Sequence, residues 1–287
     1  MTCRILITGI TSIHGWPIFK HFKNKGTCQV FGVRPPKMKI PEGDDTVSLC
    51  ITDASSLLKI KNEFNPTHVI HGAGVCDLDV CEERPLWTHR MNTIGARNIA
   101  DIFGDSAYIV FLSSDLVFSG NNPPHSGYKE DDIPDPVSVA GKTIANAENE
   151  IRRCKRYCIV RLGLPIGDSV TGTKGAKDFI AYRLRRNLPL TLFHDEFRSC
   201  IGCEDIARSI DVILEHEIRG IYHLGGPKPV SLYNIGKWVL DNGGYDSLLL
   251  KSISRFEERD GPPRIGNVMI DSSKIYKILP FRIESPV

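Results

Sequence analysis

A glycine-rich turn near the start of the chain has the residue types needed to bind a phosphate. The segment "RILITGITSIHG" places Gly9 and Gly15 between a strand-like apolar run and a helix-like stretch. Glycines there permit a tight bend and let a diphosphate approach the N–H groups at the helix N-terminus. Ser12 stands at the middle-glycine position, where its hydroxyl can donate to a phosphate oxygen, although its Cβ narrows the approach. We predict that Gly9, Ser12, Ile13 and Gly15 face a dinucleotide; the alternative is a turn without a ligand.

The second apolar run ends in "FGVRPPK", which bears on the choice of dinucleotide. NAD-specific sites place a carboxylate at this strand end, where it accepts hydrogen bonds from the ribose hydroxyls. Arg34 instead can pair with a 2′-phosphate and stack on adenine. The sequence therefore favours NADP, with NAD possible. A solvated arginine at a strand end is the alternative.

The nine cysteines do not form a metal-binding pattern. Four of them lie in or beside strand-like apolar runs, where a thiol behaves as a small hydrophobe: Cys3, Cys28, Cys50 and Cys158. Cys200 and Cys203 have the spacing of a zinc or redox pair, but no second Cys or His pair follows at zinc-finger spacing. We predict no metal site.

The elements that must position the turn alternate along the first part of the chain. Strand-like runs are expected at 3–8, 28–34, 67–74, 107–114 and 157–163. Helix-like stretches are expected at 14–25, 54–64, 85–104 and 138–154. Nearly continuous apolar strands separated by helices are typical of a parallel sheet buried on both faces. We therefore predict an α/β fold with a Rossmann-type, doubly wound parallel sheet.

After Pro165 the alternation becomes irregular. "TGTKGAK" (171–177) lacks the Gly-Lys-Ser/Thr ending of a phosphate loop, so we interpret it as a substrate-side loop. Further helices are expected at 178–187, 204–215 and 231–241, with strand-like runs at 189–193 and 220–226. We predict a dinucleotide-binding domain at 1–164 and a smaller substrate-binding lobe at 165–287, whose segments near 200–228 return to the first domain.

Composition excludes several classes of partner. Lys and Arg total 36 and Asp and Glu total 34, so no charge excess favours nucleic acid or an anionic membrane. No apolar run approaches the roughly 20 residues that a membrane-spanning helix needs. The start "MTCRILITGI" has no signal-peptide pattern, so we expect a cytoplasmic protein.

Motifs along nearly the whole chain resemble those of extended short-chain dehydrogenases/reductases. The similarity is greatest to the dTDP-4-dehydrorhamnose reductase branch, which includes the regulatory β subunit of methionine adenosyltransferase. The motifs are "HGAG" (71–74), "MNTIGARNIA" (91–100), "SSDLVFSGNNPP" (113–124), "EDDIPDPVSVAGKT" (130–143) and "RIGNVMIDSSK" (264–274).

The resemblance implies further cofactor contacts. Gly72, Ala73 and Gly74 would line the dinucleotide, and Ile51 would lie near its adenine. Cys50 stands where the family has an acid that contacts the adenine side. We interpret the nearby Asp53 instead as the N-cap of the next helix.

The resemblance also implies substrate contacts. Ser113 would lie beside the nicotinamide, and Ser114 would bond the substrate's reacting oxygen. Asp115 follows in the chain and would face the substrate. Arg198, in "HDEFRSCIGCEDIA", would face a nucleotide diphosphate, with an ion pair to Glu196 or Asp195 as the alternative.

The family's catalytic tyrosine and lysine lie four residues apart on one helix face, where the tyrosine protonates a carbonyl oxygen as hydride arrives. In "PVSVAGKTIANAE" (136–148) these positions hold Ala140 and Ile144. A rival register would present Ser138 and Lys142 instead. That register requires a shift of two residues, which turns the helix by about 200° and spoils the flanking matches.

Other proton donors are therefore needed if the protein is a reductase. Ser114 and Tyr128 are the candidates, although Tyr128 matches a tyrosine that shapes a loop in the family. His14 and His125 have suitable intrinsic pKa values, but we interpret both as packing or surface residues.

The sequence thus favours an NADP-dependent reductase of a nucleotide-linked keto-sugar with a non-standard proton donor. The alternative is a catalytically silent regulatory protein that binds NADP or a nucleotide sugar. Epimerisation or dehydration with tightly held NAD ranks third, because relatives with those activities keep the lysine. A homodimer or a regulatory partner protein is implied by the resemblance alone.

Overall fold

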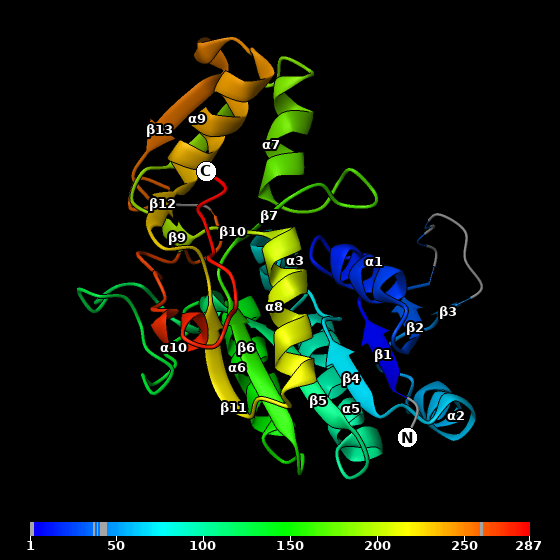
Figure 1. Cartoon of the computed structure of the whole chain (residues 1–287). Helices are drawn as coiled ribbons and strands as arrows, with labels where there is room; N and C mark the ends of the chain where they lie inside the picture. The colour runs from blue at the N-terminus through cyan, green and yellow to red at the C-terminus, as the bar shows by residue number, and fades with distance from the viewer. Residues whose placement is uncertain (1–2, 37, 39, 41–44, 259–260) are drawn as a thin grey trace.

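The computed structural model describes residues 3–36, 38, 40, 45–258 and 261–287, and its centre is a seven-stranded parallel sheet (Figure 1). The strand order is β11-β6-β5-β4-β1-β2-β3, which reverses direction between β1 and β4. The strands are β1 (Arg4–Thr8), β2 (Gln29–Arg34), β3 (Thr46–Ser48), β4 (His68–His71), β5 (Tyr108–Ser114), β6 (Tyr157–Leu162) and β11 (Gly220–Leu224). This order confirms the predicted Rossmann-type fold, in which ligands bind where the strand order reverses.

Helices cover both faces of the sheet. On one face α1 (Gly15–Lys25) and α8 (Cys203–Glu215) bury apolar side chains such as Ile18 and Ile210 against the strands. On the other face lie α2 (Ala54–Phe64), α5 (Gly95–Phe103) and α6 (Val139–Ile151). Strands with apolar residues on both faces require this double cover, because each face must be removed from water.

The predicted helix over 85–104 is interrupted. Pro85 begins a short helix, α4 (Pro85–His89), and a π-helical turn (Arg90–Ile94) precedes α5. Another short helix, α3 (Leu78–Glu83), lies just before Pro85. The π-helical turn adds a residue to the helical ladder, and such turns often lie at functional sites.

The smaller lobe lies at one end of the sheet, at the top of Figure 1. Its helices α7 (Ala176–Leu184) and α9 (Leu232–Gly243) pack around β8 (Leu190–Phe193), which pairs in parallel with β13 (Leu250–Ile253). The remaining elements are β7 (Pro165–Ile166), β9 (Phe197–Ser199), β10 (Ile201–Gly202), β12 (Pro229–Ser231) and α10 (Ser273–Tyr276). Between β10 and β12 the chain returns to the sheet as α8 and β11. The division at residue 165 stays a prediction.

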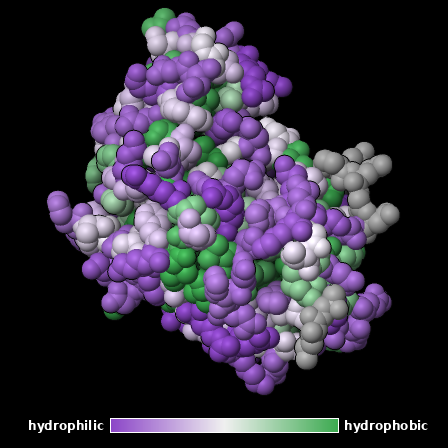
Figure 2. Space-filling view, viewed as in Figure 1, coloured by the Kyte–Doolittle hydropathy of each residue, from purple (hydrophilic) through white to green (hydrophobic). Residues whose placement is uncertain are grey.

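Figure 2 shows that the face of the molecule seen in Figure 1 is mostly hydrophilic, with an apolar area near its centre. Residues 279–283 line a shallow hollow with Tyr276 and Pro227. Among the described residues, no helix has the length and hydropathy needed to cross a membrane.

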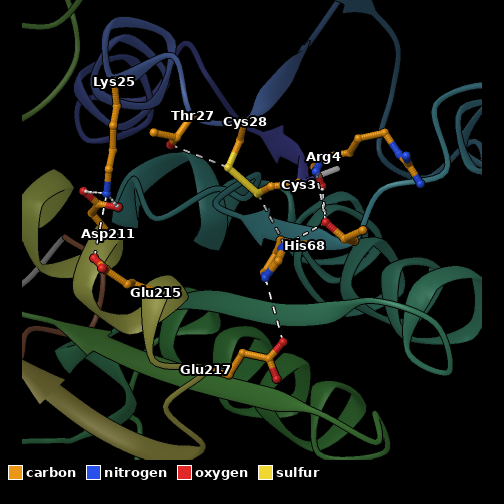
Figure 3. The surroundings of a disulfide bond; sticks show 10 residues. Cys3, Arg4, Lys25, Thr27, Cys28, His68, Asp211, Glu215 and Glu217 are labelled. Atoms are coloured by element: carbon orange, nitrogen blue, oxygen red, sulfur yellow. Dashed lines mark hydrogen bonds and ion pairs between the residues drawn. A yellow bond between two sulfur atoms is a disulfide. The ribbon is translucent and has the colours of Figure 1, made fainter. Parts of the chain in front are cut away.

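Cys3 and Cys28 form a disulfide, so the interpretation of both as independent apolar thiols was wrong (Figure 3). The register pairs Arg4 with Gln29, which brings the starts of β1 and β2 together and leaves the two Cα atoms 4.7 Å apart. The bond therefore closes a ring that contains β1, the glycine-rich turn and α1. In Figure 3, His68 lies beside Cys3, with Sγ and Nδ1 4.0 Å apart.

Candidate functional site

The glycine-rich turn packs tightly on the segment that follows β4. Gly9 has a φ of 76°, and a Cβ there would lie 2.5 Å from the carbonyl oxygen of Gly72. A Cβ on Gly15 would lie 2.2 Å from the carbonyl oxygen of Gly9. Both positions therefore require glycine. The structure brings the predicted turn together with the predicted Gly72–Gly74 segment at the point where the strand order reverses.

Ser12 fills the place of the missing middle glycine. Its Oγ accepts a hydrogen bond from Gly15 N at 3.0 Å, at the first turn of α1. The hydroxyl group of Ser12 donates its hydrogen to no acceptor in the described part of the chain. It is available to donate to a phosphate oxygen, and the predicted contact of Ser12 with a dinucleotide stays a prediction.

His14 introduces a buried imidazole into this turn. Both of its ring nitrogens are inaccessible to solvent and have no hydrogen-bond partner in the structure. Nε2 lies 3.5 Å from the place that a Cβ on Gly72 would occupy. Burial lowers the pKa of His14 to about 4, so the ring is neutral near pH 7. An unsatisfied buried donor costs about 1–3 kcal/mol, which a bound hydrogen-bond acceptor would recover.

Arg34 ends β2 with part of its guanidinium unsatisfied. Its Nη1 donates to the carbonyl of Met38 at 2.8 Å, whereas the buried Nε has no partner in the structure. The side chain is therefore held near the strand end, where a 2′-phosphate was predicted. Ile51 is buried against α5, since a Cβ on Gly95 would lie 2.9 Å from its Cγ2. Its predicted proximity to adenine stays a prediction.

Asp53 caps α2, as predicted, and accepts from Ser56 N at 3.1 Å. The loop after β4 is fixed by Asn92 of the π-helical turn, a residue that was not predicted to belong to the site. Asn92 Oδ1 accepts from Val75 N at 2.7 Å, and its Nδ2 donates to Thr143 Oγ1 at 2.9 Å. This side chain joins the predicted cofactor segment to α6.

Ser113 belongs to a buried polar network. Its Oγ donates to Glu148 Oε1 at 2.6 Å, and Arg161 donates to both Glu148 oxygens at 2.9 Å. The Ser113 hydroxyl therefore donates to Glu148. The predicted contact of Ser113 with nicotinamide would have to come from its backbone. Glu148 and Arg161 were not predicted. Arg161, a charged residue inside the strand-like run "YCIVRLG", could have indicated this network, because a buried charge requires a partner.

The three residues predicted to bind substrate lie together. Ser114 Oγ donates to Asp115 Oδ1 at 3.1 Å, and Arg198 Nε donates to Asp115 Oδ2 at 2.7 Å. Asp115 is fully buried and Arg198 is 7% exposed. Although burial opposes it, the Asp115 carboxylate holds the pKa of Arg198 above its ordinary value. Most of the guanidinium charge is therefore neutralised within the protein.

The proposed alternative partners of Arg198 bind other groups. Glu196 pairs with Arg264, with 2.7 Å between Oε2 and Nη2. Asp195 accepts from Ser254 Oγ at 2.6 Å. The alternative, an ion pair of Arg198 with Glu196 or Asp195, does not form among the described residues, because β9 directs the guanidinium towards the end of β5. The contact of Arg198 with a nucleotide diphosphate stays a prediction.

The register of α6 is fixed by its N-terminus. Ser138 is the N-cap, and its buried Oγ accepts from Gly141 N at 3.1 Å. Lys142 is exposed. A Cβ on Gly141 would lie 2.1 Å from the carbonyl oxygen of Leu116, so this contact tolerates no slippage. A serine–lysine pair at Ser138 and Lys142 is therefore excluded.

Ala140 and Ile144 face an apolar cluster. Ala140 is fully buried and Ile144 is 8% exposed. Their neighbours in the cluster include Leu116, Phe118 and Tyr128. This face of α6 contributes packing and carries no acid or base at either position.

Tyr128 is a packing residue in this structure. Its ring stacks on Phe118 with 4.1 Å between the ring centroids, and burial raises the pKa of its hydroxyl. His125 is exposed. Neither side chain is positioned by a contact with Ser114 in the described residues.

Cys200 and Cys203 are buried, and burial raises the pKa of each to about 12. Among the described residues, no group of three or more His, Cys, Asp or Glu side chains is arranged to hold a metal ion.

Comparison with known proteins gives consistent matches. A family model described as "RmlD substrate binding domain" matches residues 3–285. The chain is 27% identical to methionine adenosyltransferase 2 subunit beta of Xenopus laevis, covering 98% of this chain and 85% of that protein. It is 24% identical to the spore coat polysaccharide biosynthesis protein SpsK of Bacillus subtilis, covering 91% of this chain and 86% of that protein.

Solved structures share the fold. The dTDP-4-dehydrorhamnose reductase of Bacillus anthracis in complex with NADP superposes with a TM-score of 0.83 at 20% identity, covering 99% of this chain and 96% of that one. The UDP-glucose 4-epimerase of Thermus thermophilus in complex with NAD superposes with a TM-score of 0.84 at 20% identity, covering 96% and 92%.

Proposed function

This chain belongs to the RmlD substrate binding domain family, and from that premise we propose that it is a catalytically silent dinucleotide-binding protein that acts through a partner protein. The observation that carries the proposal is the apolar burial of Ala140 and Ile144. These are the positions at which the family resemblance expects the tyrosine and lysine that transfer the proton. A reductase without that pair loses a positioned acid, which contributes about 10²–10⁴-fold to the rate.

The proposed ligand is a nicotinamide dinucleotide. The glycine-rich turn, the free hydroxyl hydrogen of Ser12 and the unsatisfied imidazole of His14 support binding of its diphosphate. Structural neighbours include proteins solved in complex with NADP and with NAD. Arg34, with an unpartnered Nε, favours the 2′-phosphate of NADP.

The proposed partner is a methionine adenosyltransferase. Several curated relatives are named as its subunit beta, and they match nearly the whole of this chain. A subunit that binds a dinucleotide without consuming it can change its partner's activity when ligand binding favours one state of the complex. Proton-transfer residues are not needed for that role.

The first test is the chemical content of the purified protein. Ultraviolet absorbance and mass analysis would identify co-purifying NADP(H), and calorimetry would compare NADPH with NADH. We expect a dinucleotide to bind, with NADPH preferred. A protein that binds neither dinucleotide contradicts the cofactor assignment.

The second test concerns the partner and the chemistry. We expect this chain to co-elute with a methionine adenosyltransferase catalytic subunit and to leave NADPH unoxidised in the presence of a dTDP-linked 4-keto-6-deoxy sugar. Steady NADPH consumption with the sugar would overturn the proposal and support a reductase.

A nucleotide-sugar reductase is the second candidate because of one observation. Ser114 lies at the end of β5 with its Oγ 3.1 Å from Asp115 Oδ1, so a hydroxyl stands where the resemblance expects the substrate oxygen. In that case Ser114, a substrate hydroxyl or water would handle the proton. The nucleotide-linked sugar would then be the ligand of the smaller lobe.

A further inference from the structure

The loop between β7 and α7 is held in one shape by a buried serine. Ser169 Oγ accepts from Thr173 N and from Lys174 N, both at 3.1 Å. The same oxygen donates to Asp178 Oδ2 at 2.5 Å, and both side chains are buried. This segment, residues 168–175, contains most of the Gly/Thr/Lys stretch that the sequence analysis interpreted as a substrate-side loop. Its backbone is fixed by its own side chains.

The loop contacts the glycine-rich turn, although the two segments are far apart in the sequence. Gly175 has a φ of 85°, and a Cβ there would lie 2.2 Å from Cδ1 of Ile13. A side chain at position 175 would overlap with Ile13, so the loop backbone lies directly against the Ile13 side chain. A segment of the smaller lobe therefore lies over the turn at which the diphosphate is expected.

Lys174 is the cation of this loop that has no ion-pair partner among the described residues. Its neighbour Lys177 pairs with Asp168 at 2.7 Å. Lys174 directly precedes Gly175, whose backbone contacts Ile13, so Lys174 lies beside the glycine-rich turn. Burial raises the pKa of the Cys76 thiol, in the loop that follows β4, and the charge of Lys174 acts in the opposite direction.

Independent features of the turn also indicate a missing polar ligand. The ring nitrogens of His14 are buried and have no hydrogen-bond partner, and the Ser12 hydroxyl donates to no acceptor among the described residues. Both residues flank the N-terminus of α1, an 11-residue helix whose first N–H groups attract anions. An anion at this point would meet donors from the turn, and Lys174 is the nearby cation of the adjoining loop.

We propose that Lys174 binds the diphosphate of the dinucleotide, and that loop 168–175 holds this lysine over the glycine-rich turn through the contact of Gly175 with Ile13. The inference rests on the proposed function, since it requires a dinucleotide at the turn. It adds a ligand contact supplied by the smaller lobe. Ligand binding thereby joins the two parts of the chain.

The charge is tested by two lysine variants in the full-length protein. Calorimetric titration with NADPH is expected to give about tenfold weaker binding for Lys174→Ala, the loss of one charge-assisted hydrogen bond. Lys177→Ala, which removes a neighbouring charge at the start of α7, should bind as the unsubstituted protein does. Lys174→Arg should recover most of the affinity. Equal affinity of Lys174→Ala and Lys177→Ala overturns the inference.

A second ligand distinguishes the diphosphate of the dinucleotide from that of a nucleotide sugar. UDP serves as the probe for the latter. We expect Lys174→Ala to change NADPH affinity and to leave UDP affinity unchanged. A loss confined to UDP would assign Lys174 to a substrate diphosphate and overturn the inference.

The contact is tested by two glycine variants. Gly172 and Gly175 both have positive φ, 64° and 85°, but a Cβ on Gly172 would meet no atom within 4 Å. Gly172→Ala therefore controls for backbone strain. Gly175→Ala should weaken NADPH binding more than Gly172→Ala, because its Cβ displaces the loop from Ile13. Equal losses of NADPH affinity in Gly175→Ala and Gly172→Ala would overturn the role of the Gly175–Ile13 contact. Failure of the unsubstituted protein to bind NADPH would overturn the proposed function as well.

Discussion

The guanidinium of Arg198 donates to both carboxylate oxygens of Asp115, and this buried pair joins β9 of the smaller lobe to the end of β5. Removing one partner leaves an uncompensated buried charge, which costs about 3–5 kcal/mol. We expect Arg198→Ala to lower the free energy of unfolding by this amount in urea denaturation.

Lys155 provides the control for that prediction. It forms an exposed ion pair with Asp105 at 3.0 Å, and exposed pairs contribute about 0–1 kcal/mol. Lys155→Ala should therefore have little effect. A loss for Arg198→Ala as small as that for Lys155→Ala would show that the Asp115 charge is relieved by solvent.

His14→Leu should have opposite effects on the free and the ligand-bound protein. The leucine removes two unsatisfied buried nitrogens, so the ligand-free protein should gain about 1–3 kcal/mol of stability. NADPH binding should weaken, because the ligand loses a hydrogen-bond partner. Thermal unfolding with and without NADPH measures both effects. A leucine variant that is destabilised without ligand would indicate that the imidazole has a partner in solution.

Much of the fold could be predicted from local patterns. Five strand-like runs and their intervening helices appear in order, because alternation of apolar strands with helices is a local property of the chain. The turn was equally visible, because its glycine pattern is local in the sequence, although the contact that requires glycine at position 9 comes from Gly72. The π-helical interruption at Arg90–Ile94 was missed, because the helix-like pattern over 85–104 gives no local sign of it.

Pairings between distant residues could not be predicted. Asp115 and Arg198 are 83 positions apart, and the bond between them depends on how the lobe folds back on the sheet. The contact of Gly175 with Ile13 depends on the same arrangement. The residue types gave the chemistry of each group, but only the three-dimensional structure gave its partner.

The stability of the protein should fall as the pH falls below neutrality. Burial lowers the pKa values of four histidines from 6.5, including His68, and three of them reach low values: His14 about 4, His71 about 3 and His223 about 3. The unfolded chain then binds more protons than the folded one below pH 6.5. Their contribution is fully present above that pH and is lost as the pH falls towards the folded values. The expected loss is about 1.4 kcal/mol per histidine at pH 5.5.

Urea denaturation at pH 7.5 and pH 5.5 measures this loss. His14→Leu should reduce the difference between the two pH values by one histidine's share, whereas a substitution of the exposed His125 to Ala should not change it. An unchanged difference in His14→Leu would mean that His14 titrates normally.

Reduction of the Cys3–Cys28 disulfide should destabilise the protein. The bond joins residues 25 positions apart, and a cross-link that closes a loop of this size contributes about 3 kcal/mol in the chain-entropy account. Dithiothreitol should lower the urea midpoint of the natural protein and leave that of Cys3→Ser unchanged. Denatured, unreduced protein should present seven thiols to a thiol reagent. Nine thiols would contradict the disulfide.

The double variant Ala140→Tyr with Ile144→Lys tests whether the site lacks only the proton relay. Both side chains would enter an apolar cluster, and overpacking there should cost about 1–3 kcal/mol. If the rest of the site is retained, the pair should raise NADPH consumption with a dTDP-linked 4-keto-6-deoxy sugar by about 10²–10⁴-fold. Ile144→Lys alone should produce no such gain, because lysine only assists the tyrosine. An unsubstituted protein that already consumes NADPH at the variant's rate must contain another proton donor, and Ser114 would then be the first residue to replace.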